Sequence, residues 1–399
     1  MSAAQAGPDG ARGVAPSALT EAERPGCPVG EADGTSEARC GSAARHGGAR
    51  QRPAERRPES RRDRLELMAR RYTLTPQMRD YDTLERKAWL PYLMIFHPPR
   101  LRTATFSTDE AGFRRTLRRG VPISWEAYNA AGRRRAALIG GSAAFGVGAS
   151  SDAGTVSSLL AGQEERLWWN FAGRGFNSTQ ELLVFLLHLP QDVERILIFS
   201  GANNLALSYM AGTTSPVYNS FYAQSIFERG LRSGLVTGVR GSLNLLVRAM
   251  ARKLAAPNAA RQPQNEAERY DHVIACFRRD LRLWALLGEA LGCPVQFVLQ
   301  PMAAWIDKTL SPEEEELFGI LDRCDPTGSW EGLSAYVQRE RGRYVEDVRR
   351  LCEEWRIPFL DMNRCASFTE RRWLFVDRAH LTDEGYALAA EKIQKEWSL

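Results

Sequence analysis

Short apolar runs alternate with longer amphipathic stretches over residues 131–399. Each run is apolar along most of its length, which is typical of a parallel strand buried on both faces. The predicted strands are 136–140, 166–172, 195–200, 295–299 and 357–361. The predicted helices are 178–187, where Ser178 and Glu181 have capping-box spacing, 266–291, 331–355 and 382–397, with another that begins at Ser311. This alternation predicts an α/β fold, a parallel sheet of about five strands with helices on both faces.

Three other regions lack this rhythm. Residues 1–67 are rich in Ala, Gly, Arg, Pro and Ser, which predicts a disordered arm, unless translation begins at Met68. Residues 68–130 are aromatic and irregular, and we expect a lead-in packed on the main domain 131–399. Within it, Thr103–Thr108 alternates like an edge strand.

Residues 205–264 fit no strand–helix unit, and we interpret them as an insert that forms a lid over the site. The stretch 243–254 is basic and amphipathic. Two interpretations stay open: weak contact with a membrane surface, or a core-facing helix with a solvated basic side.

Composition narrows the class of protein. The chain has 53 Lys and Arg against 48 Asp and Glu, well mixed along the sequence, so nothing argues for nucleic-acid binding. Its seven cysteines include no C-x-x-C pair, which argues against a zinc site or a disulfide framework and suggests a reducing compartment. No run approaches the length of a membrane span. We therefore expect a cytoplasmic protein, whose oligomeric state the sequence leaves open.

The first predicted strand ends at Gly140-Gly141 and is followed at once by Ser142. Ligands of open α/β sheets bind at the carboxyl ends of strands, which is where a nucleophile is useful. A plain glycine turn is the simpler interpretation. A phosphate-binding loop lacks its Lys, and a G-x-S-x-G elbow fails because Ala144 replaces the second Gly.

Partners for Ser142 stand in three other segments. His380 precedes the last helix, and Asp377 three residues earlier can orient its imidazole, which supplies a base for a serine nucleophile. Gly175 and Asn203 follow the second and third strands, where their N–H groups can stabilise an oxyanion. Each of these residues alone is also ordinary turn or loop chemistry.

Together the four segments resemble the blocks of the SGNH/GDSL hydrolase superfamily, in a bacterial form with G-G-S in the first block. The resemblance covers residues 136–397, from Gly140-Gly141-Ser142 through 170–175 and 201–204 to Asp377–His380. It implies a three-layer, flavodoxin-like sheet. It also implies a catalytic triad of Ser142, His380 and Asp377, an oxyanion hole of Ser142, Gly175 and Asn203, and no metal or organic cofactor.

Two positions depart from the family pattern. Gly141 replaces the Asp of G-D-S, and Asn204 replaces the usual acid after Asn203. From the sequence we expect Asn204→Asp to leave activity within a few-fold or to raise it. The function predicted is an esterase that removes an O-acetyl or short O-acyl group from a small metabolite or carbohydrate. The alternatives are an O-acyltransferase with the same triad and a non-catalytic regulatory or binding protein of this fold.

Overall fold

A computed structural model describes residues 60–84, 88–211, 221, 265–325 and 329–397. The strands are β1 (Leu117–Arg118), β2 (Val121–Pro122), β3 (Arg135–Gly140), β4 (Leu167–Asn170), β5 (Val193–Ser200), β6 (Val295–Leu299) and β7 (Phe359–Asp361). The helices are α1 (Arg61–Leu74), α2 (Met78–Asp82), α3 (Trp125–Ala130), α4 (Ser142–Phe145), α5 (Val156–Gln163), α6 (Ser178–His188), α7 (Ala202–Ala211), α10 (Glu266–Leu291), α11 (Pro312–Cys324), α12 (Ser329–Glu354) and α13 (Asp383–Trp397).

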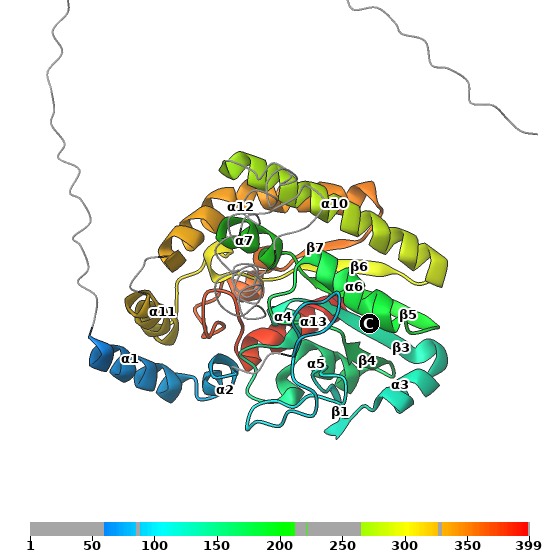
Figure 1. The fold of residues 1–399 in the computed structure, drawn as a ribbon, viewed down its shortest axis with the longest axis horizontal. Helices are drawn as coiled ribbons and strands as arrows, with labels where there is room; N and C mark the ends of the chain where they lie inside the picture. Colours follow the sequence, from blue (N-terminus) through cyan, green and yellow to red (C-terminus); the bar gives the residue numbers. More distant parts are fainter. Residues whose placement is uncertain (1–59, 85–87, 212–220, 222–264, 326–328, 398–399) are drawn as a thin grey trace, which may run out of the picture. The chain divides into compact units, whose positions relative to one another are not determined.

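Five parallel strands of the described chain form the main sheet, in the order β4-β3-β5-β6-β7. Numbered along the sheet's own sequence, this is the 2-1-3-4-5 order of flavodoxin-like folds. Helices α5 and α13 pack together on one face, while α6 and α10 pack together on the other with α12 beside α10 (Figure 1). The predicted fold class, a three-layer α/β sheet, is therefore confirmed.

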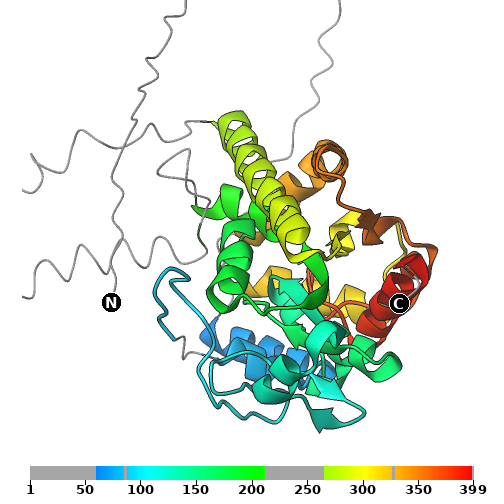
Figure 2. The same cartoon turned by 90° about the vertical axis from the view of Figure 1, so that its right-hand side faces the viewer.

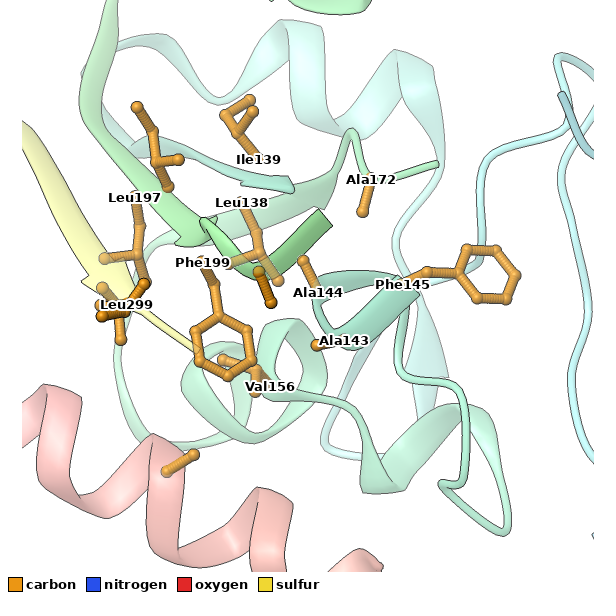
Figure 3. Close-up of a cluster of buried hydrophobic side chains, with 14 of the residues drawn as sticks. Leu138, Ile139, Ala143, Ala144, Phe145, Val156, Ala172, Leu197, Phe199 and Leu299 are labelled. Carbon is orange, nitrogen blue, oxygen red and sulfur yellow. The ribbon is translucent and has the colours of Figure 1, made fainter. Parts of the chain in front are cut away.

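The core is closely packed where β3 ends. All six residues of β3 are buried, because strands lie on both of its sides and helices on both faces. Ala143 and Ala144 of α4 lie beside Phe199 and Val156 in Figure 3. A side chain at Gly140 would overlap the carbonyl oxygen of Phe199, so only glycine lets α4 start this close to β5.

The lead-in follows the lower side of the domain in both views, drawn in blue and cyan (Figures 1 and 2). Its first helix corrects the predicted boundary of the disordered arm, because α1 already begins at Arg61. The Ser60 hydroxyl accepts the N–H of Asp63, and the Asp63 carboxylate accepts the N–H of Ser60, which caps the helix. The remainder of the arm, residues 1–59, lies outside the described residues.

The predicted edge strand at Thr103–Thr108 was wrong. The Thr103 hydroxyl accepts the N–H groups of Thr105 and Phe106 and so turns the chain back on itself. Only isolated bridges, such as Arg102 with Ser107, remain there.

The insert was also placed too early. Residues 202–211 form α7, the ordinary helix that follows β5, so the segment outside the strand–helix pattern begins after it. Except for Phe221, residues 212–264 lie outside the described part of the chain, and the predicted lid and membrane contact at 243–254 lie with them. None of the described helices is long and apolar enough to cross a membrane.

Helix α6 is capped one residue earlier than predicted, by Asn177 with Gln180. Glu181 is therefore free of capping and is buried at 1% exposure, where it accepts the Ser200 hydroxyl at 2.5 Å. Burial raises the pKa of Glu181 to about 8, with a contribution from the Asp280 charge that the Ser200 hydrogen bond opposes. Glu181 thus holds a proton at neutral pH in the folded chain.

This proton makes the free energy of unfolding depend on pH. Between the ordinary Glu pKa of 4.5 and about 8 the folded state binds more protons than the unfolded state, so stability falls as pH rises through that window. Glu181→Gln removes this decrease in the free energy of unfolding, because glutamine does not titrate, and it still offers the Ser200 hydroxyl an acceptor. The variant should melt at the wild-type temperature near pH 5 and above it near pH 8, as measured by circular dichroism. Exposed Glu289→Gln is the control, and a difference that stays constant with pH would contradict the assignment.

Candidate active site

Ser142 is the first residue of α4 and follows β3 across Gly141. From β3 the chain passes to β4 on one side of the sheet and then returns to β5 on the other. The loops after β3 and β5 therefore diverge, and ligands of doubly wound sheets bind at this switch point. The position of Ser142 thus agrees with the sequence prediction.

His380 lies in the loop before α13 and links Ser142 to Asp377. Its Nε2 is 2.8 Å from Ser142 Oγ, and its Nδ1 is 2.8 and 2.9 Å from the two carboxylate oxygens of Asp377. An imidazole nitrogen that faces a carboxylate carries the proton, so Nε2 presents its lone pair to the Ser142 hydroxyl. This is the geometry by which a histidine accepts a serine proton.

The loop keeps Asp377 ionised. Burial alone would raise the pKa of this carboxyl, but the charge and hydrogen bond of His380 and the N–H of Ala379 lower it to about 2. Asp377 Oδ1 accepts the backbone N–H groups of both Ala379 and His380 at 2.9 Å. The carboxylate is thus fixed by the same short loop that carries the imidazole.

Gly175 and Asn203 line the same cavity as Ser142 and His380, a space of about 280 Å³. Asn203 stands in the first turn of α7 and its amide donates to the carbonyl of Phe176 at 2.8 Å. This bond ties the loop after β4 to the helix after β5. The structure thus brings four of the five predicted site residues to one cavity, and the fifth, Asp377, lies behind His380 on its Nδ1 side.

Gly141, the first departure from the family pattern, touches the Asn203 amide. A Cβ built at Gly141 would lie 2.5 Å from Asn203 Nδ2, closer than side chains approach one another. The Asn203 side chain therefore occupies the space that the side chain of the G-D-S Asp would need. Any side chain at position 141 must push that amide away.

Gly141→Ala should accordingly lower kcat while changing the melting temperature little, because the group displaced is the end of one half-buried side chain. Loss of a single oxyanion donor costs on the order of a hundred- to a thousand-fold in turnover. Steady-state kinetics and thermal melts measure the two effects. Gly342→Ala, at an exposed helical glycine with open space around it, is the matched control. A Gly141→Ala enzyme with wild-type kcat would show that the Asn203 amide is not required where it lies.

Asn204, the second departure, is 2% exposed and bonded twice to Ser178. Its Oδ1 accepts the Ser178 N–H at 2.9 Å and its Nδ2 donates to the Ser178 hydroxyl at 2.8 Å. That hydroxyl donates in turn to Asp280 of α10 at 2.6 Å. Position 204 thus has no acid of its own, but the Ser178 hydroxyl links it to an acid on a neighbouring helix, Asp280.

This network predicts a loss of stability for Asn204→Asp, a separate effect from the change in activity that the sequence predicts. The new carboxylate would lose the donor that Ser178 accepts and would add a second buried charge near Asp280, which is only 1% exposed. We expect the variant to melt roughly 5–10 °C lower. The double variant Asn204→Asp/Asp280→Asn has its single acid at position 204, so it should recover part of the lost melting temperature. Equal melting temperatures for wild type and Asn204→Asp would refute the charge argument.

His97 also lines the cavity, and the sequence analysis gave it no role. Its Nε2 accepts the backbone N–H of Arg174 at 3.2 Å, and its Nδ1 lies 3.2 Å from the carbonyl of Gly112. Burial, aided by the nearby Arg174 charge, lowers the pKa of His97 to about 3, so the ring stays neutral. His97 holds the loop that carries Gly175. The sequence shows only a histidine before two prolines, and no local pattern points to this contact.

Arg114 of the lead-in braces the loop that follows α4. It is 1% exposed, and its guanidinium donates to the carbonyls of Gly146 and Ser151 at 2.7 and 3.0 Å and to Asp152 at 2.9 Å. A charged hydrogen bond to a buried carbonyl is stronger than a neutral one.

Within the described ranges, no group of three or more His, Cys, Asp or Glu side chains could hold a metal ion.

Comparison with known proteins finds likeness only at the level of solved structures, since no family model and no curated protein matches the chain. One match, from Desulfitobacterium hafniense and described as a lipolytic protein of the G-D-S-L family, has 12% identity and a TM-score of 0.35, over 66% of this chain and 98% of that one. An extracellular lipase from Streptomyces rimosus has 13% identity and a TM-score of 0.36, over 65% and 98%.

An acetylxylan esterase from Geobacillus stearothermophilus has 14% identity and a TM-score of 0.33, over 66% of this chain and 93% of that one. These structures include a protein of the family that the four sequence blocks resemble. At such identities and TM-scores they carry no conclusion about what this chain does.

Proposed function

We propose that this protein is a serine hydrolase that cleaves an O-acyl ester of a small metabolite or carbohydrate. The observation that carries the proposal is the unbroken line from Ser142 Oγ through His380 to Asp377, with each hydrogen bond between 2.8 and 2.9 Å. Nucleophilic catalysis by serine needs such a base, oriented by a third group.

In the first half of the reaction Ser142 Oγ attacks the ester carbonyl carbon while its proton passes to His380 Nε2. Asp377, ionised, stabilises the imidazolium that forms. The negative charge on the carbonyl oxygen is met by the N–H groups of Ser142 and Gly175 and by the Asn203 amide. An amide has two N–H bonds, and one of those of Asn203 is used by Phe176, which leaves the other for the oxyanion.

His380 then gives its proton to the departing alcohol oxygen as the ester bond between that oxygen and the carbonyl carbon breaks, which leaves an acyl group on Ser142. Water then attacks the acyl carbon while His380 takes its proton. This attack forms a tetrahedral intermediate on Ser142. When the bond from its carbon to Ser142 Oγ breaks, His380 returns the proton to Oγ and a carboxylic acid is released. The first and last states of the enzyme are identical, so every proton is accounted for.

Ser142→Ala tests the proposal against a non-catalytic role. It should abolish hydrolysis of p-nitrophenyl esters, a loss of about six orders of magnitude, and should also abolish labelling by a fluorophosphonate probe. Ser151→Ala, at an exposed serine nine residues on, is the matched control and should keep both. A wild-type protein that neither labels nor turns over would be a binding protein. If an added alcohol captures most of the acyl group in preference to water, the enzyme is an acyltransferase.

A further inference from the structure

An apolar stripe on α7 continues directly from Asn203. Ala206, Leu207 and Met210 follow it at spacings of three, four and seven residues, so all four lie along one face of the helix. All of them line the cavity that contains Ser142. An ester whose carbonyl oxygen binds the Asn203 amide therefore lies next to the apolar face of α7.

Helix α12 and the segment after β6 supply further apolar wall. Leu333 and Val337 of α12 line the cavity together with Met302. Helices α7 and α12 pack closely here, because the rings of Tyr209 and Tyr336 stack at 5.0 Å and a Cβ at Gly332 would lie 2.6 Å from the Tyr209 hydroxyl. The two helices thus support one another, and the apolar surface between them is preformed.

Both arginines that line the cavity, and the imidazole of His97, make hydrogen bonds to other protein groups. Arg378 donates to both carboxylate oxygens of Asp322 at 2.8 Å, which compensates its charge. Arg174 donates to the carbonyl of Tyr81 at 2.9 Å, and His97 accepts the backbone N–H of Arg174. These contacts leave the cavity suited to an apolar group more than to a polar or anionic one.

We propose that this surface binds the acyl chain of the substrate and that the enzyme prefers medium-chain acyl esters to acetyl esters. The inference rests on the proposed function and replaces the acetyl or short acyl group that the sequence predicts. The acyl part, and not the alcohol, lies along α7 because the carbonyl oxygen must reach Asn203. The alcohol oxygen must instead face His380 Nε2, in the loop 377–381, to receive its proton.

Burial of methylene groups sets the expected selectivity. Each methylene moved from water into an apolar site should raise kcat/KM about four-fold until the cavity is filled. An acetyl group leaves most of a 280 Å³ cavity empty. We expect an optimum at about six to ten carbon atoms and a preference for octanoate over acetate of at least about a hundred-fold.

A pair of isomeric esters separates the two possible orientations. Ethyl octanoate and octyl acetate have the same atoms, but the long chain is acyl in the first and alcohol in the second. The full-length enzyme should hydrolyse ethyl octanoate at least about ten-fold faster at equal low concentration. Faster cleavage of octyl acetate would place the alcohol on α7 and overturn the inference.

Filling the cavity should shorten the preferred chain. Ala206→Leu places a branched side chain on the stripe and should lower the octanoate-to-acetate ratio of kcat/KM for p-nitrophenyl esters by at least about ten-fold. Ala335→Leu makes the same change at an exposed site on α12 and should keep the wild-type ratio. A ratio that falls equally in both variants, or in neither, would contradict an acyl site on α7.

Failure of the proposed function remains distinguishable. If no ester is cleaved in a Ser142-dependent way, the hydrolase proposal fails and this inference fails with it. If cleavage depends on Ser142 but the p-nitrophenyl series peaks at acetate, only the inference is overturned.

Discussion

The close approach of three backbone segments at the end of β3 determines the rest of the site. At Gly140 a side chain would overlap the carbonyl of Phe199, and at Gly141 it would lie 2.5 Å from the Asn203 amide. With no side chain at either position, α4 and α7 start side by side at the switch point of the sheet. The proposed nucleophile Ser142 and the proposed oxyanion donor Asn203 are therefore neighbours because Gly140 and Gly141 have no side chains.

Buried charge is concentrated around this same end of the sheet. Buried Arg114, buried Asp280 and half-buried Asp377 each make several hydrogen bonds to segments that carry or border the five site residues. Burying a charge is costly unless it is paired and hydrogen-bonded, so these contacts add less to stability than their number suggests. What they provide is a single geometry for loops that would otherwise have several.

Much of the sheet could be predicted because a strand buried on both faces must be apolar throughout. The runs at 195–200 and 295–299 coincide with β5 and β6 to within two residues. Thr103–Thr108 alternates as a strand does, but the hydroxyl of Thr103 accepts the N–H of Phe106 and turns the chain, and the distant Asp152 carboxylate accepts the Ser107 hydroxyl. Side-chain competition of this kind leaves no trace in hydrophobic periodicity.

The site shows the same division. Blocks of local sequence lead to five site residues, although their catalytic roles stay predictions. The structure places Ser142, Gly175, Asn203 and His380 at one cavity and Asp377 behind His380. The supporting residues were missed because their contacts are distant in sequence. Asp280 alone had a usable signal: it stands three residues after Phe277 and four before Trp284, an acid on the buried stripe of its helix. His97 had none, because its contact exists only once the lead-in is folded against the loop after β4.

The bond between Ser142 and His380 joins residues 238 positions apart, and this separation affects when the site can exist. A ribosome adds roughly 5–20 residues per second, so the serine leaves it on the order of tens of seconds before its histidine is made. Until then Ser142 has no base and is an ordinary hydroxyl. A chain that stops before residue 380 therefore carries Ser142 without the histidine that the proposed reaction needs.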